Sequence, residues 1–125
     1  MSTWTSDELD LLGSATELQI STRRPDGTLR AAVPIWVVRA GDSIYVRSYR
    51  GPDGGWFQRA TAGGSAHIQA GTLTSDVTVT PAEATARAEI DQAYRSKYAA
   101  FGRAYVDPMT AAPAAATTLQ LTPQR

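Results

Sequence analysis

The 125-residue sequence contains no cysteine and a single histidine, His67, and these scarcities remove several classes of function. Without cysteine the chain cannot form disulfides, thiolate metal sites or a cysteine nucleophile. A metal centre or a Ser-His-Asp triad would depend on His67 alone, and this residue alternates with its neighbours in a strand-like run. We therefore expect a structural role for His67 and no metal site.

Long apolar runs are also missing, because none approaches the ~20 residues that a membrane helix needs. The first five residues lack the basic and then apolar order of a signal peptide, and Asp7 and Glu8 follow at once. We expect a cytoplasmic protein with no membrane partner. The length predicts a single domain, residues 1–125, with one core.

Lysine is scarce, since Lys97 is the one lysine among twelve basic residues, and the formal net charge is zero. Nucleic-acid binders are typically basic as a whole, so we expect no nucleic-acid partner. Residues 23–59 contain three aspartates and seven arginines, a local excess of positive charge. These arginines are Arg23, Arg24, Arg30, Arg39, Arg47, Arg50 and Arg59. Arginine suits bidentate recognition of phosphate or carboxylate, so this local excess predicts a small anionic ligand.

Period-two alternation and short apolar runs predict five strands, at 16–22, 43–48, 66–70, 72–80 and 117–122. A sixth is predicted at 28–39, where the sequence is nearly all apolar after Arg30, and we expect this strand to be central and covered on both faces over much of its length. Pro34 lies in the strand at 28–39, and because proline cannot donate to a ladder, we expect an edge or a bulge where that strand bends. Helices are expected at 6–12, capped by Ser6, at 56–62 and at 83–101, with a loop at 107–116. The pattern predicts a mainly β (α+β) fold, a six-stranded barrel with accessory helices whose first helix covers one end.

The strongest local signal is the glycine-rich loop at 50–55, which lets backbone N–H groups approach a ligand closely. The helix expected after it would point its N-terminus at the same space. Arg47, Ser48 and Arg50 lie at or before the loop, and Arg59 follows it. We predict an anion-binding site here, with Trp56 packed under the loop to fix its path.

The run T-R-R-P-D-G-T-L-R-A-A-V-P-I-W-V-V-R-A-G-D-S-I-Y-V-R-S-Y-R-G, followed by G-G-W-F-Q-R-A, resembles the split β-barrel flavin- and deazaflavin-binding proteins. It is most similar to the deazaflavin-dependent nitroreductase group and to the proteins gathered as domain of unknown function 2255. The likeness covers about residues 18–79. The positions that match the pattern are Thr22, Arg24, Gly27, Arg30, Pro34, Trp36, Ser48, Arg50, Gly51 and Trp56.

The resemblance implies an FMN-binding-like split barrel that forms a homodimer. It further implies that FMN or a deazaflavin coenzyme is bound, with its phosphate held by the first turn and the Ser-Arg-Gly loop. The ring would then lie against the second and third strands near the dimer seam. Apolar side chains at Trp36, Tyr45 and 94–101 also favour a dimer, because one small core cannot cover them all.

The leading hypothesis is a flavin- or deazaflavin-dependent oxidoreductase that acts on a small organic substrate. The groups expected to pair with phosphate or an acidic tail are Arg24, Arg30, Arg47 and Arg50. The tyrosines that could donate a proton to the reduced substrate are Tyr45, Tyr49 and Tyr98.

The alternative hypothesis is a barrel without a redox cofactor that binds a small anionic or aromatic molecule. Such a protein would act as a carrier or as a cyclase-like biosynthetic catalyst. One position favours this alternative: Pro25 stands in the first turn, where nitroreductase relatives usually have lysine.

Overall fold

The structure is a computed structural model that describes residues 3–124. Within this range lie five α-helices: α1 (Ser6–Ser14), α2 (Gly55–Gly63), α3 (Arg87–Lys97), α4 (Arg103–Thr110) and α5 (Ala112–Ala115). The same range contains seven strands: β1 (Leu18–Ser21), β2 (Val33–Ile35), β3 (Val37–Ala40), β4 (Ser43–Val46), β5 (Ser65–Ala70), β6 (Leu73–Pro81) and β7 (Leu119–Pro123). None of the helices in these residues is long and apolar enough to cross a membrane.

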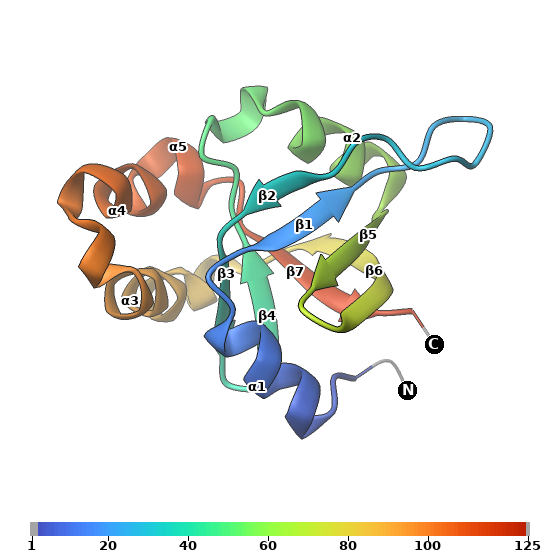
Figure 1. Cartoon of the computed structure of the whole chain (residues 1–125). Helices are drawn as coiled ribbons and strands as arrows, with labels where there is room; N and C mark the ends of the chain where they lie inside the picture. Colours follow the sequence, from blue (N-terminus) through green and yellow to red (C-terminus); the bar gives the residue numbers. More distant parts are fainter. Residues whose placement is uncertain (1–2, 125) are drawn as a thin grey trace.

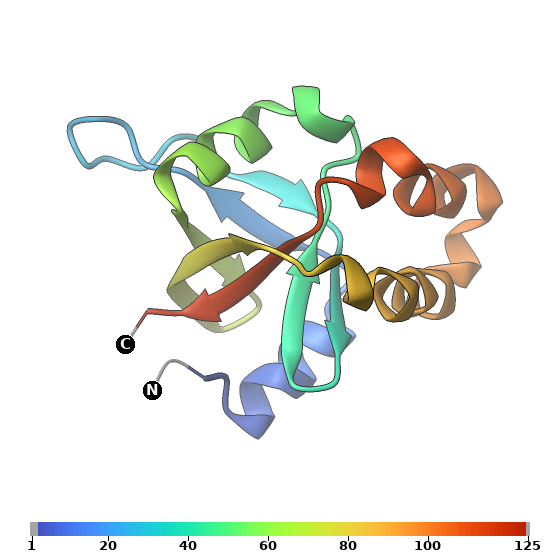
Figure 2. The same cartoon turned by 180° about the vertical axis from the view of Figure 1, so that it is seen from behind.

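The strands form one antiparallel sheet in the order β2-β1-β5-β6-β7-β4-β3. Its two edge strands, β2 and β3, follow each other directly in the chain with only Trp36 between them. The sheet therefore curls until its two edges meet at this bend, and Figures 1 and 2 show the nearly closed barrel that results. This is the predicted split-barrel architecture, with seven strands in place of six.

The seventh strand arises because the strand expected at 28–39 is divided. Residues 28–32 are largely exposed and outside any strand, apart from one isolated bridge between Arg23 and Leu29, so the expectation of a long buried strand is wrong there. Pro34 lies in β2 with an exposed side chain, at the edge of the sheet. The expected bend at an edge is thus confirmed, since a missing N–H costs nothing on the unpaired side of an edge strand.

The main core fills the barrel, and α1 and α2 cover its two ends. Leu9 and Leu12 of α1 and Trp56 and Ala60 of α2 all belong to the cluster formed by the inward-facing strand residues. The helix expected to cover one end does so. Its N-cap is Thr5 rather than Ser6, because Thr5 and Glu8 form a reciprocal capping box.

A second core lies outside the barrel, where α3 packs against β3 and α4 packs against α3 (Figure 1). It buries Tyr45, Tyr94 and Tyr98 together with aliphatic neighbours. The helix expected at 83–101 is confirmed over its middle, flanked by short 3-10 turns. The loop expected at 107–116 is wrong, because those residues contain the end of α4 and all of α5.

Candidate functional site

A pocket of about 520 Å³ lies where β2, the segment after β4, the start of α2 and α4 come together. This volume is in the usual range for small-molecule sites. Its walls are formed by Glu17, Val33, Pro34, Ile35, Trp36, Arg47, Ser48, Tyr49, Arg50, Gly54, Gly55, Trp56, Arg59, Tyr105 and Met109. The fold thus brings to one cavity eight of the residues that the sequence singled out: Pro34, Trp36, Arg47, Ser48, Tyr49, Arg50, Trp56 and Arg59.

The start of α2 forms one end of the pocket. Gly54 is its N-cap and supplies no side-chain hydrogen bond, so the first N–H groups of the helix keep their capacity to bind an anion. Gly54 also lies so close to Ser48 that an added Cβ would come within 2.3 Å of the Ser48 Oγ. That hydroxyl is buried and has no hydrogen-bond partner within residues 3–124. Together, Ser48 and the helix start present several unused hydrogen-bonding groups to the pocket.

Two pocket arginines keep their charge largely unpaired. Arg59 donates from Nε to the Thr22 hydroxyl at 3.2 Å, and its guanidinium lies beside Gly55 at the start of α2. Arg50 is exposed, and its guanidinium forms no hydrogen bond or ion pair to any of the residues described. Within the same residues no carboxylate pairs with either cation, and Glu17 is the one acidic residue that lines the cavity. The pocket therefore carries a net positive charge.

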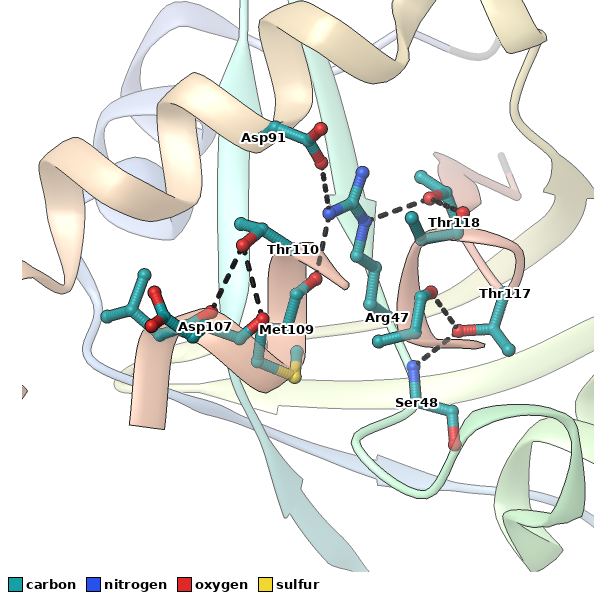
Figure 3. Close-up of polar contacts among 11 residues, drawn as sticks. Arg47, Ser48, Asp91, Asp107, Met109, Thr110, Thr117 and Thr118 are labelled. Atoms are coloured by element: carbon teal, nitrogen blue, oxygen red, sulfur yellow. Dashed lines mark hydrogen bonds and ion pairs between the residues drawn. The ribbon is translucent and has the colours of Figure 1, made fainter. Parts of the chain in front are cut away.

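Arg47 is different, because its guanidinium is already engaged by the protein (Figure 3). Its side chain is fully buried, with Nε donating to the Thr118 hydroxyl at 2.9 Å and Nη1 to the Met109 carbonyl at 2.8 Å. Nη1 also forms an ion pair with Asp91 of α3, and the guanidinium lies over the Tyr94 ring. Arg47 thus connects β4 to α3, α4 and the start of β7, and one nitrogen, Nη2, is left without a hydrogen bond among the described residues.

An aromatic stack forms another wall. The Trp36 ring lies parallel to the Tyr98 ring, with centroids 3.8 Å apart and planes 1° apart. The Tyr98 hydroxyl accepts the Val37 N–H at 3.0 Å and donates to the Thr16 carbonyl at 2.6 Å. Burial raises the pKa of Tyr98 to about 12. Tyr98 therefore holds Trp36 in place from behind, with its hydroxyl committed to the backbone.

Trp56 belongs both to the barrel core and to the pocket wall, and only 8% of it is exposed. Its ring meets that of Phe57 edge to face, with centroids 6.2 Å apart. The side chain thus anchors the first turn of α2 to the barrel, which is the position expected of a residue that fixes the loop.

Five predicted site residues lie outside the pocket: Arg24, Arg30, Gly51, Tyr45 and Tyr98. Arg24 lies in the loop that extends from the barrel before β2 (Figure 1), where its Nη1 donates to Leu29 and Thr28. Arg30 donates its N–H to the Thr22 carbonyl, and Gly51 adopts φ 68° in the turn after Arg50. Tyr45 and Tyr98 belong to the second core.

The sequence did not indicate Glu17, Tyr105 and Met109 as pocket residues. Tyr105 is 59% exposed, and with Met109 it places α4 against the cavity. The alanine- and proline-rich composition around residue 110 concealed this helix. A periodic signal was nevertheless present, since Val106 and Met109 are three residues apart and both buried.

His67 lies away from the pocket, on β5. Its Nδ1 is 3.0 Å from Asp76, which also pairs with Arg23 at 2.9 Å. The bonds from His67 and Arg23 lower the pKa of the Asp76 carboxyl, so these three residues join β5, β6 and the chain after β1. Over the described residues no cluster of three or more histidine or acidic side chains could hold a metal ion.

Several solved structures share this fold. HutZ, the heme storage protein from Vibrio cholerae, superposes with a TM-score of 0.65 and 12% identity over 93% of this chain and 87% of its own. A FAD-binding protein from Mesorhizobium loti gives 0.64 and 13% over 98% and 90%, and an F420 reductase gives 0.50 and 13% over 93% and 92%. At such low identity the likeness establishes the split-barrel fold alone, because one fold can serve many functions.

No curated protein matches the sequence significantly. A family model, by contrast, matches residues 8–121, which is nearly the whole chain and includes β2, the glycine-rich loop, α2 and α4. The match extends well beyond the segment on which the sequence resemblance rested. The chain therefore belongs to the family described as an uncharacterized protein conserved in bacteria, DUF2255.

Proposed function

We propose that the pocket binds a flavin-type cofactor, FMN or a deazaflavin coenzyme, and that the protein is an oxidoreductase acting on a small organic substrate. One observation carries this proposal: a single cavity joins a flat aromatic wall to a positively charged end built from Arg50, Arg59 and an uncapped helix. That combination suits a ligand with a planar ring and an anionic tail.

The pocket residues divide between the two parts of such a ligand. Arg50, Arg59, Ser48 and the N–H groups at the start of α2 would bind the phosphate. Trp36 would contact the ring, and Tyr105 of α4 also lines the pocket. When bound, the cofactor would supply the hydride chemistry, which no side chain can perform.

A proton for the reduced substrate would come from Tyr49. This tyrosine is the one predicted proton donor that lines the pocket, and it is 61% exposed, so its hydroxyl can meet both solvent and substrate. In this proposal Tyr45 and Tyr98 have structural roles, because both are buried in the second core. Arg47 fixes the pocket floor through its bonds to Thr118 and Met109.

We further propose a cytoplasmic homodimer. The protomer buries Tyr45, Tyr94 and Tyr98 in its own second core, so those residues no longer argue for a partner. The residues that favour a partner are instead Tyr49, Phe101 and Tyr105, which are 47–61% exposed. Two of them line the pocket and Phe101 packs against Trp36, so a second copy placed here would cover apolar area and enclose the site.

Titration of the purified protein with FMN, a deazaflavin coenzyme and heme, followed by absorbance and fluorescence, tests the proposal. We expect one of the first two to bind, and Arg59→Ala to weaken that binding about tenfold while Arg24→Ala leaves it unchanged. Heme binding alone would overturn the proposal, as would binding that depends equally on both arginines. Failure of all three to bind, with retained binding of a small aromatic anion, would favour the cofactor-free carrier or cyclase-like catalyst that Pro25 suggests.

A further inference from the structure

A second pocket, of about 500 Å³, lies on another face of the molecule between α1, β3 and α3. Its walls are mixed: Leu9, Val38 and Ala93 supply apolar surface, and the polar or charged lining residues are Asp10, Ser14, Arg39, Ser96 and Lys97. Lys97, the one lysine in the sequence, lines this pocket from the last turn of α3. The site is separate from the proposed cofactor pocket, with which it shares no lining residue.

Lys97 is held by backbone carbonyls rather than by acids. Its Nζ donates to the Val37 carbonyl at 2.6 Å and to the Leu12 carbonyl at 3.3 Å, and it lies 5.3 Å from the centre of the Tyr98 ring. Across residues 3–124 no carboxylate forms an ion pair with this ammonium. Two N–H groups are thus fixed, and in the neutral amine the lone pair occupies the remaining tetrahedral position.

The other cation that lines this pocket, Arg39, is more than compensated by two carboxylates. Arg39 pairs with Asp10 at 2.9 Å and with Asp42 at 3.6 Å, and its Nε donates to the Gly41 carbonyl at 2.8 Å. No cation is therefore left over to attract an anionic ligand, apart from Lys97 itself. A pocket that contains one amine and no other unpaired cation suits an uncharged electrophile better than a phosphorylated one.

We infer that Lys97 is a nucleophilic amine that captures small uncharged aldehydes as an imine in the second pocket. The neutral Nζ attacks the carbonyl carbon to give a carbinolamine. Its hydroxyl then takes a proton and leaves as water, so that a C=N bond replaces the C=O bond with no change of oxidation state. The protonated imine keeps one N–H, which can still donate to Val37.

The protonation state of Lys97 agrees with this role. Burial lowers the pKa of Lys97 to about 8, so a sizeable fraction of the amine is neutral near pH 7.5. An exposed lysine of ordinary pKa is almost entirely protonated there. Reactivity toward carbonyl compounds should therefore distinguish Lys97 from a lysine placed elsewhere on the same helix.

The test uses propanal together with sodium cyanoborohydride, which reduces an imine to a stable secondary amine. The parent protein is compared with the double variant Arg95→Lys/Lys97→Arg, whose one lysine lies at an exposed position of α3. Peptide mapping by mass spectrometry follows each site, with the terminal α-amine as internal reference. We expect Lys97 to react about tenfold faster than the relocated lysine at about pH 7.5.

Equal or slower modification of Lys97 would overturn the inference. The parent is also compared with Nα-acetyl-lysine amide, which keeps the test decisive if the double variant does not fold. Modification that appears only after unfolding in urea would likewise count against it, because the amine would then be sealed by its carbonyl partners. If Lys97 reacts faster than the reference lysines, and if Leu9→Ala or Ala93→Ser slows that reaction, then the aldehyde reacts while bound in the second pocket.

Discussion

Two segments of this protein have similar residues and different surroundings: the extended loop 22–30 and the pocket segment 47–59. Each has arginines next to a turn that contains glycine and proline. In the first, Arg23 pairs with Asp76 and Arg24 donates to carbonyl and hydroxyl oxygens of its own loop. In the second, the Arg50 guanidinium forms no hydrogen bond or ion pair to any residue of 3–124, and that of Arg59 donates to one hydroxyl.

The difference shows that a count of cations does not locate an anion site. What matters is how much hydrogen-bonding capacity the neighbours leave unused, and this depends on residues distant in the sequence. Arg47 is an example within the pocket itself. Its guanidinium is already bonded to Asp91, Met109 and Thr118 and has little capacity left for a ligand. By this criterion we assign Arg23 and Arg47 to stability and propose Arg50 and Arg59 for ligand binding.

The largest effect is expected for Arg47→Ala. Removing one partner of a buried ion pair leaves the other charge and two acceptors without compensation, so we expect a loss of about 3–5 kcal/mol in the free energy of unfolding. Urea denaturation measures it. The control is Arg24→Ala, an exposed change expected to stay within about 0.5 kcal/mol.

A loss for Arg47→Ala as small as that of the control would mean that Asp91 and the carbonyl oxygens recover solvent or other partners. Arg47 would then have to be counted with Arg50 and Arg59, and the distinction between stabilising and ligand-binding arginines would fail.

Arg50→Ala and Arg59→Ala should act on binding instead. Each removes a charge-assisted contact with an anionic ligand, worth about 1–3 kcal/mol, while the free energy of unfolding changes little. Calorimetry with the ligand identified by titration measures both losses against Arg24→Ala. Equal losses from all three variants would show general electrostatic attraction and remove the distinction between the two segments.

Much of the fold could be predicted because its signals are local. Alternation identified most of the strands, and Pro34 marked the edge and the bend. The segment 28–32 was assigned to a strand on its apolar content, although nothing in the barrel pairs with most of it. The helices α4 and α5 were missed because Pro108 and Pro113 suggest breaks, yet both are tolerated, Pro113 at a helix start and Pro108 inside α4.

The site was predictable only in part, for the same physical reason. The glycine-rich loop and the helix after it are contiguous, so their joint position could be inferred. The partners of Arg47 lie 44 to 71 residues away, and no local pattern reveals such pairings. Tyr98 likewise stacks on Trp36 through packing between α3 and the bend of the barrel, a contact that no local pattern reveals. Tyr98 was predicted as a proton donor, but in the structure it supports the pocket wall.

Gly54→Ala tests how closely the pocket segment is fitted. The new Cβ would approach the Ser48 Oγ to 2.3 Å, so the serine must rotate inside a buried site. We expect a loss of about 1–3 kcal/mol in the free energy of unfolding, in the range of overpacking, and weaker ligand binding. Gly63→Ala is the matched control in the same helix. Its Cβ meets open space, and a gain of up to about 1 kcal/mol is expected from helix propensity.

Restoration of stability in Gly54→Ala/Ser48→Ala would attribute the loss to the hydroxyl contact. If Gly54→Ala were as stable as Gly63→Ala, then Ser48 would have room to turn and the fit of the loop would be looser than the structure indicates.

The smallest effect is expected from Lys97. Its ammonium donates to backbone carbonyls and forms no ion pair with a carboxylate of residues 3–124. Its pKa is about 8 in the folded protein and ordinarily 10.5, so between these values the unfolded chain binds more protons than the folded one. The free energy of unfolding must therefore rise with pH as the pH passes from 8 toward 10. Because the ammonium is only half-buried, the rise should be about 1 kcal/mol, well below the value for full burial.

Urea denaturation of the parent and of Lys97→Met at several pH values isolates this contribution as the difference between the two proteins. The range should stop near pH 10, because Tyr98, with its pKa raised to about 12, begins to act in the opposite direction above that point. There the unfolded tyrosine loses its proton first, and the folded state is destabilised. A difference between the proteins that stays constant from pH 7 to 10 would show that Lys97 titrates normally. Its carbonyl contacts would then compensate the charge as fully as the carboxylates of Asp10 and Asp42 compensate Arg39.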